Sequence, residues 1–360
     1  MLNFNDIFVD DTKYGMKIPK EKYLSVGLYP VIDQSKEQIA GYTDESEGIY
    51  CDVPAIIFGD HTRIIKYIDV PFFLGADGTK LLKIKDNTAF NCKYLYYALS
   101  NAKIPNTGYN RHFKWLKELS FNIPSIEKQR EIADLMDIIV NLENLMKKQL
   151  EKLELFVKSR FIEMFGDPVT NQKGWEKVRL ADKCSIITGN TPPRANKEYY
   201  GSYIEWIKSD NITSNMYLTQ AAEYLSLEGL VVGRKVDPGS ILMTCIAGSL
   251  KSIGNVAIAN RPITFNQQIN AVVPNEQNTL FMYEQFKLAK EYITSDVNMA
   301  LKGILSKGQL SEKQFIFPPI DLQNQFADFV AQVDKSKLAI QQSLDELETL
   351  KKSLMQQYFG

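Results

Sequence analysis

The side chains with the greatest capacity for chemistry in this 360-residue chain are two histidines and four cysteines. His61 follows Asp60 directly, but neighbouring residues on a strand point to opposite faces, which argues against an acid–base pair. His112 also lies in a polar stretch, where a lone histidine most often serves as a hydrogen-bonding group. The four cysteines lie far apart without a CxxC pair, which excludes a local zinc site and a disulfide framework. They are Cys51, Cys92, Cys184 and Cys245.

Motifs for phosphate or cofactor chemistry are missing from the sequence. There is no GxxxxGK[ST] loop and no GxGxxG fingerprint after a strand-like run. The stretch 190–194, NTPPR, has two prolines like the catalytic tetrapeptide of adenine-N6 methyltransferases, but Arg194 stands where that motif needs an aromatic residue. A nuclease-type carboxylate cluster is not evident either. The sequence therefore predicts neither catalytic residues nor a metal site in this chain.

The composition is that of a globular protein, with 44% hydrophobic and 24% charged residues. No apolar run approaches the roughly 18–20 residues that span a bilayer, and the first residues do not form a signal peptide. We therefore expect a cytoplasmic protein without membrane association. Lys and Arg number 42 and Asp and Glu 43, so any nucleic-acid surface must be a local patch or be completed by a partner.

The chain repeats itself at an offset of 194 positions. Residues 121–129, FNIPSIEKQ, are echoed by residues 315–323, FIFPPIDLQ, and the match continues without a gap to Phe165-Gly166 and Phe359-Gly360. Neither Gly nor Pro interrupts 127–165 or 321–359. Each copy is therefore predicted to be one long helix.

Apolar residues in both copies recur at steps of three and four, which indicates a coiled-coil seam. In the first copy they are Ile132, Leu135, Ile139, Leu142, Met146, Leu153 and Phe156, and in the second Phe326, Phe329, Val333, Ile340, Leu347, Leu350 and Leu354. The alternative is that the two amphipathic helices pack separately, each on its own domain.

The rest of the chain forms two globular segments with short β-branched runs and short helical patterns. Residues 29–33 of the first parallel residues 204–208 of the second, and mixed α/β structure is predicted for both. The expected order is a globule (1–123), a long helix (124–166), a second globule (167–316) and a second long helix (317–360).

Polar loops mix donors and acceptors in both globules. Arg and Lys pair with guanine and Asn and Gln with adenine, so this mixture suits the recognition of base edges, although simple solvation is the alternative for any one loop. The candidate DNA-binding residues are Arg63, Lys80, Arg111 and Lys114 in the first globule, and Arg194, Lys208, Asn211, Lys251 and Gln267 in the second.

The order of several short motifs resembles the specificity (S) subunit of type I restriction–modification systems. In the second globule these motifs are 189–193 (GNTPP), 206–212 (WIKSDNI) and 265–268 (FNQQ). The helix entry at 124–130, PSIEKQR, is similar to the family's Pro-Pro-x-x-Glu-Gln segment, with Ser125 and Lys128 departing from it. The resemblance covers nearly the whole chain.

The resemblance implies two target-recognition domains, each binding one half of a split sequence in double-stranded DNA. It implies that the long helices pair antiparallel, which gives the internal repeat pseudo-two-fold symmetry. It further implies two modification (methyltransferase) subunits that carry S-adenosylmethionine, and restriction subunits with ATP-dependent translocase and nuclease activity. The chain itself would hold no cofactor. The alternatives are a single-chain DNA methyltransferase or nuclease with an unrecognised site, and a protein scaffold that does not touch DNA.

Overall fold

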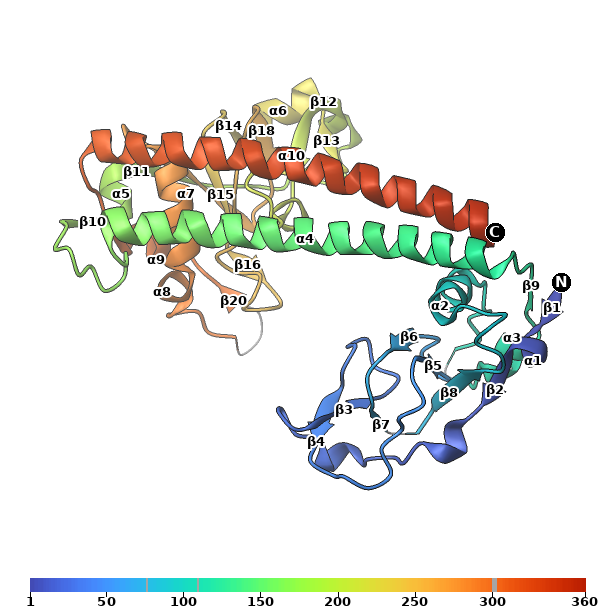
Figure 1. Ribbon diagram of the computed structural model, residues 1–360. Coiled ribbons are helices and arrows are strands. Elements are labelled where there is room, and N and C mark those ends of the chain that lie inside the picture. Colours follow the sequence, from blue (N-terminus) through green and yellow to red (C-terminus); the bar gives the residue numbers. More distant parts are fainter. Residues whose placement is uncertain (76, 109, 300–302) are drawn as a thin grey trace. The chain divides into compact units, whose positions relative to one another are not determined.

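The computed structural model describes residues 1–75, 77–108, 110–299 and 303–360 (Figure 1). It divides into two compact units, one of Met1–Lys148 with Gln341–Gly360 and one of Gln149–Ile340. Both mix helices with strands, which confirms the predicted α/β class. Ala76, in one of the polar loops that the sequence suggested, lies outside the described residues. In the part of the chain that the structure describes, no helix is long and apolar enough to cross a membrane.

Two sheets form the globular part of the first unit. Their strands are β2 (Phe8–Asp10), β3 (Tyr29–Ile32), β4 (Gly41–Thr43), β5 (Ala55–Gly59), β6 (Ile65–Ile68), β7 (Phe73–Leu74) and β8 (Thr79–Ile84). The larger sheet has the antiparallel order β2-β8-β5-β6. The smaller has the order β4-β3-β7, in which β3 and β7 are parallel.

The second unit repeats this arrangement. Its strands are β11 (Cys184–Thr188), β12 (Tyr200–Ile207), β13 (Tyr224–Leu225), β14 (Lys235–Val236), β15 (Ile241–Thr244), β17 (Val256–Ile258), β18 (Ile263–Phe265) and β19 (Ile269–Pro274). One sheet has the order β11-β19-β15-β17 and the other β13-β12-β18-β14, with β12 and β18 parallel. The predicted correspondence of 29–33 with 204–208 falls on the equivalent strands β3 and β12.

Short elements complete each unit. Three two-stranded pairs are β1 (Leu2–Asn3) with β9 (Ser120–Phe121), β10 (Lys177–Arg179) with β21 (Gln314–Ile316), and β16 (Ile246–Ala247) with β20 (Gly303–Ile304). The short helices are α1 (Phe4–Ile7), α2 (Cys92–Asn101), α3 (Phe113–Lys117), α5 (Leu180–Lys183), α6 (Leu227–Val232), α7 (Thr279–Leu288), α8 (Lys290–Thr294) and α9 (Lys307–Glu312). Helices α2 and α7 occupy equivalent places along the chain. Each follows the last strand, β8 or β19, of the antiparallel four-stranded sheet of its unit.

The two long helices predicted from the repeat are present, as α4 (Ile126–Phe165) and α10 (Ile320–Phe359). Each has an acidic residue in its first turn, Glu127 or Asp321, where the positive end of the helix dipole favours it. Gly166 ends α4 with φ of +77°, a conformation that glycine adopts without steric cost.

A buried glutamine fastens the start of each long helix to the neighbouring short helix. Gln129 donates from Nε2 to the carbonyl of Pro124 (2.9 Å) and accepts at Oε1 from the backbone N–H of Asn91 (2.8 Å). Gln323 likewise accepts from the N–H of Asn278 (3.0 Å). Because these two asparagines cap α2 and α7, each glutamine fixes a long helix to its own globule.

The helices α4 and α10 pack antiparallel within each unit. In the first unit Glu143, in the first half of α4, binds Lys351 near the end of α10 (2.7 Å). In the second unit Phe156, near the end of α4, meets Phe329 near the start of α10, with ring centroids 5.0 Å apart. Early residues of one helix thus face late residues of the other, which confirms the antiparallel pairing.

The helices also bury part of their surface against the globules. Met136 joins a core with Leu95 of α2, and Phe161 stacks on Phe281 of α7 (5.5 Å). Each long helix therefore packs both on the other long helix and on a globule, so the two packing alternatives occur together. The four-segment division of the chain stays a prediction, because the compact units divide inside both long helices.

The expected seam residues differ in burial along the helices. Those that are buried are Ile132, Ile139, Phe326 and Val333; those that are half-buried are Leu135, Met146, Leu153, Phe329, Ile340, Leu347 and Leu354. Leu142, Phe156 and Leu350 stay 40, 54 and 49% exposed, so burial is uneven along the predicted seam. An α-helix drifts relative to a strict heptad, and contacts with two neighbours favour a wider buried face.

Candidate nucleic-acid interface

Loops from four parts of the first unit meet in one polar cluster, which we call the first loop cluster. It comprises Gln34, 60–63, 77–80 and 110–114. The amide of Gln34 joins two of these loops, since Oε1 accepts from the N–H of His61 (3.1 Å) and Nε2 donates to the carbonyl of Asp77 (2.9 Å). This cluster lies where β3, β5 and β7 end.

Asp60 and His112 hold the first loop cluster together. The buried carboxylate of Asp60 accepts from the N–H of Phe113 (2.7 Å) at the start of α3. The N–H of His112 donates to the carbonyl of Asp60 (2.8 Å), and its Nδ1 lies 3.0 Å from the same oxygen. His61 instead places Nδ1 3.2 Å from the carbonyl of Asn110. These contacts give both histidines and Asp60 structural partners, and the capping role of Asp60 was not predicted from the sequence.

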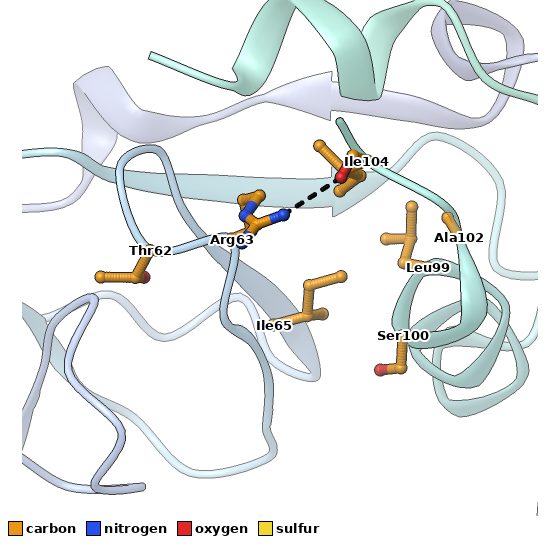
Figure 2. Close-up of a pocket in the computed structure, with 7 residues that line it drawn as sticks. All are labelled: Thr62, Arg63, Ile65, Leu99, Ser100, Ala102 and Ile104. Carbon is orange, nitrogen blue, oxygen red and sulfur yellow. Dashed lines mark hydrogen bonds between the residues drawn. The ribbon is translucent and has the colours of Figure 1, made fainter. Parts of the chain in front are cut away.

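Arg63 is engaged in holding its own loop. Its φ is +61°, and its Nη1 donates to the carbonyl of Ile104 (3.2 Å), which links the β5–β6 turn to the segment after α2 (Figure 2). The two sides border an open pocket of about 280 Å³, lined by Thr62, Arg63, Ile65, Leu99, Ser100, Ala102 and Ile104. Only one of the lining residues is charged, and its guanidinium already binds a carbonyl. The pocket therefore has little capacity for chemistry.

The other three candidate DNA-binding residues of the first unit differ in ion pairing and in exposure to solvent. Lys80 binds Asp10 (3.1 Å) and lies over the ring of Phe113 (4.9 Å). Lys114 is exposed beside Trp115, with Nζ 4.8 Å from the ring centroid. Arg111 is also exposed. The structure thus brings Lys80, Arg111 and Lys114 into one cluster, and the latter two present their charge to solvent.

A second loop cluster, formed by 190–194, 206–211, Glu223 and 266–268, has a cation on an aromatic platform. The guanidinium of Arg194 lies 4.5 Å from the ring centroid of Tyr200 and 4.9 Å from that of Trp206. Its Nη1 binds Glu223 (2.7 Å), and Lys208 binds the other oxygen of this carboxylate. Hydrogen bonding from Arg194 and then Lys208 lowers the pKa of Glu223 below its ordinary value.

The platform is held by the loop that the sequence compared with a methyltransferase motif. The indole N–H of Trp206 donates to the carbonyl of Asn190 (3.1 Å), and the hydroxyl of Tyr200 donates to the carbonyl of Pro192 (2.5 Å). Asn190 is itself fixed by the N–H of Arg234 (2.9 Å). The NTPPR stretch therefore supports the aromatic rings, consistent with the prediction that it is not catalytic.

An ion pair anchors the strand beneath this platform. Arg261 binds both oxygens of Glu205 on β12, at 2.5 Å from Nε and 2.6 Å from Nη2. Glu205 also accepts from the N–H of Ala221 (2.8 Å). The hydrogen bond from Arg261 is the main reason that the pKa of Glu205 lies below its ordinary value of 4.5. The sequence did not single out this pair, because its partners are 56 residues apart.

The remaining candidates of the second unit fall in three places. Gln267 is exposed and accepts from the hydroxyl of Thr191, which places it in the second loop cluster. Asn211 is 8% exposed, and its amide accepts from the N–H of Lys208 (3.0 Å), so it holds the turn and is unsuited to contact a base. Lys251 is exposed on the β16–β17 loop, whose backbone binds Lys290 of α8 (2.6 Å).

The cysteines do not form a metal or disulfide site. Burial raises the pKa of the Cys92, Cys184 and Cys245 thiols to about 12. Cys51 is exposed, and all four thiols are free. Within the described ranges, no group of three or more His, Cys, Asp or Glu residues is placed to hold a metal ion.

Comparison with known proteins finds a matching family and a similar solved structure for this chain. The family model described as "Type I restriction modification DNA specificity domain" matches residues 3–155 and 172–349. The crystal structure of the S subunit of a type I restriction–modification system from M. genitalium superposes with a TM-score of 0.66 at 16% identity. The alignment covers 99% of this chain and 95% of that one. At this identity the likeness concerns the fold.

Two curated relatives are similar over different lengths. The HindI specificity subunit of Haemophilus influenzae is 36% identical over 118 residues, which are 32% of this chain and 25% of the relative. The EcoR124I/EcoR124II specificity subunit of Escherichia coli is 24% identical over 284 residues, 76% of this chain and 69% of the relative. The match thus spans a quarter of the first relative and about two thirds of the second.

Proposed function

The chain belongs to the type I restriction–modification DNA specificity family, and from this membership we propose that it is the DNA-recognition and scaffold subunit of such a system. The resemblance inferred from the sequence is thereby confirmed. Specificity subunits are non-catalytic and carry no cofactor, while S-adenosylmethionine is bound by methyltransferase partners. The chemistry of modification would accordingly take place on another chain.

The observation that carries the proposal is the presence of two unlike loop clusters on one repeated scaffold. Both lie where the parallel strand pairs β3–β7 and β12–β18 end. The first offers exposed Arg111 and Lys114, and the second Arg194 on its aromatic platform with Gln267 beside it. Unlike side chains recognise unlike base pairs. The target would therefore be an asymmetric, two-part DNA sequence with one half-site for each unit.

The assembly would include two modification subunits and, in the complete enzyme, restriction subunits. A chain with net charge −1 gains little from a general attraction to phosphates, so partner subunits would complete the positive surface around DNA. A protein that acts on cellular DNA together with such subunits would be cytoplasmic.

Binding of labelled duplex DNA by the complex with modification subunits, measured over a series of salt concentrations, tests this function. We expect affinity to fall steeply with salt, and to fall further in the double variant Arg111→Ala/Lys114→Ala, with a smaller salt slope. Arg179→Ala is the control, because Arg179 is exposed and its ion pairs are with Asp182 and Glu312, none of which belongs to a loop cluster.

Two results would contradict the proposal. The absence of duplex binding with modification subunits present would favour a protein scaffold that does not touch DNA. Methyl transfer or DNA cleavage by this chain alone would favour a single-chain enzyme.

A further inference from the structure

We propose that Arg194 recognises a guanine in the half-site of the second unit, and that Glu223 is the positioning residue that aims it. This inference rests on the proposed function, since it assumes that the second loop cluster meets DNA. It goes beyond that function by naming the base and the residue that controls its recognition.

The first step is the restriction that the rings place on the guanidinium. The ring centroids of Tyr200 and Trp206 both lie within 5 Å of the central carbon of Arg194, and the two rings stand at 78° to each other, so the guanidinium is confined between two aromatic side chains. Its N–H groups can then donate only in the plane of the group. A planar fork of this kind matches the O6 and N7 atoms of guanine, which accept two parallel hydrogen bonds in the major groove.

The second step is the place of Glu223. One carboxylate oxygen binds Nη1 of Arg194 (2.7 Å) and the other binds Lys208. In the described part of the chain, Glu223 is the carboxylate that pairs with Arg194. The carboxylate therefore holds one end of the guanidinium, and the other N–H groups remain available to a base. Glu223 is a third exposed, and Arg194 about half exposed, so a duplex could reach both.

The third step is the fixed setting of the platform. The backbone N–H of Trp206 donates to the carbonyl of Glu223 (2.9 Å), which ties the backbone that carries the ring to the backbone that carries the carboxylate. The ion pair of Glu205 with Arg261 fixes the same strand from its other side. A preorganised side chain loses less conformational freedom on binding, which favours discrimination between bases.

In the described part of the first unit, a lysine, Lys80, lies over the single ring of Phe113, and no arginine rests between two aromatic rings. Val31 and Trp206 occupy the same register position in the parallel pairs β3–β7 and β12–β18 and both are buried, but Val31 has no aromatic ring on which a guanidinium could rest. The next residue but one is Asp33 in the first unit and Lys208 in the second. Recognition by an arginine held between two aromatic rings is therefore specific to the half-site of the second unit.

The experiment uses the complex of the whole chain with its modification subunits. The probes are duplexes that carry the sequence methylated by the complex in cells. In further duplexes, each base pair of the second half-site is changed in turn. The variants are Arg194→Ala, Arg194→Lys and Glu223→Gln, with Arg179→Ala as the matched control. Arg194→Lys retains the positive charge but loses the fork. Circular dichroism establishes that each variant is folded.

We expect Arg194→Ala and Arg194→Lys to remove the preference for guanine at one position, a loss of roughly 5- to 150-fold in discrimination. Glu223→Gln should weaken discrimination at the same position and leave other positions and the salt slope unchanged, which a general loss of stability would not do. Arg179→Ala should behave as the wild type.

Other results would overturn the inference. Equal weakening on every duplex with a smaller salt slope would make Arg194 a phosphate contact, and unchanged discrimination would mean that it does not touch the bases. A preference for another base at the affected position would also contradict it. If the wild type and the control bind no duplex at all, the proposed function fails first, and the inference fails with it.

Discussion

Val31 on β3 of the first unit and Trp206 on β12 of the second are both buried at the same register position, but only Trp206 offers an aromatic ring to its loop cluster. In the second unit the indole supports Arg194 at 4.9 Å. In the first unit, Lys80 near the start of β8 is paired with Asp10 and lies over the ring of Phe113. The two units therefore share strands but differ in the groups they offer to a ligand.

One backbone contact of the first loop cluster nevertheless has a counterpart in the second unit, at the residue that follows β15. The N–H of His112 donates to the carbonyl of Asp60 (2.8 Å), and at the equivalent place Leu305 donates to Cys245 (2.8 Å). Hydrogen bonds between backbone groups do not depend on side-chain identity. Loop sequences can thus diverge in chemistry while the frame that carries them is retained.

The long helices show the largest expected difference between the units. Phe165 is fully buried among Phe161, Phe281 and Phe326, whereas its repeat counterpart Phe359 is half-buried beside Tyr94. We expect Phe165→Ala to lower the free energy of unfolding by about 3–5 kcal/mol. Phe359→Ala should lower it by about 1–2 kcal/mol, because folding removes less apolar surface of this side chain from water.

Urea denaturation followed by circular dichroism measures both variants of this pair. Equal losses would contradict the difference in packing between the two ends of the helix pair.

The buried glutamines test what the units share. Gln129→Ala and Gln323→Ala each leave a buried backbone N–H and a carbonyl without their partner. Each should lower the free energy of unfolding by about 1–3 kcal/mol. The same denaturation experiment applies, with the exposed residues Lys128→Ala and Gln325→Ala as controls. A large loss in only one of the two variants would show that the glutamine contact does not stabilise both copies of the repeat.

The smallest effect is a pH dependence confined to the second unit. The pKa of Glu205 is below 4.5 in the folded chain, so its pairing with Arg261 stabilises fully above that pH and is lost as pH falls through the folded pKa. We expect the wild type to lose about 1 kcal/mol more than Glu205→Gln between pH 5 and acid conditions. Thermal unfolding over this range measures it, and parallel curves for the two proteins would contradict the role of the pair.

The sequence predicted the repeated elements well, because long uninterrupted periodicity and an ungapped repeat are local signals. It also singled out the exposed cations Arg111, which lies on a loop, and Lys114, which lies in α3. It did not predict that Asn211 is buried in a turn or that Arg63 binds a carbonyl. Glu223 was missed altogether. These roles depend on contacts between loops that are distant along the chain, such as Arg194 with Glu223, and no spacing rule encodes them.

Sequencing the methylated bases in cells that express this chain with its modification subunits tests the central claim most directly. We predict methylated adenines in a target of two unlike half-sites separated by a gap, with only one half-site altered by Arg194→Ala. A continuous or palindromic target, a change in both halves, or no methylation dependent on this chain would contradict it.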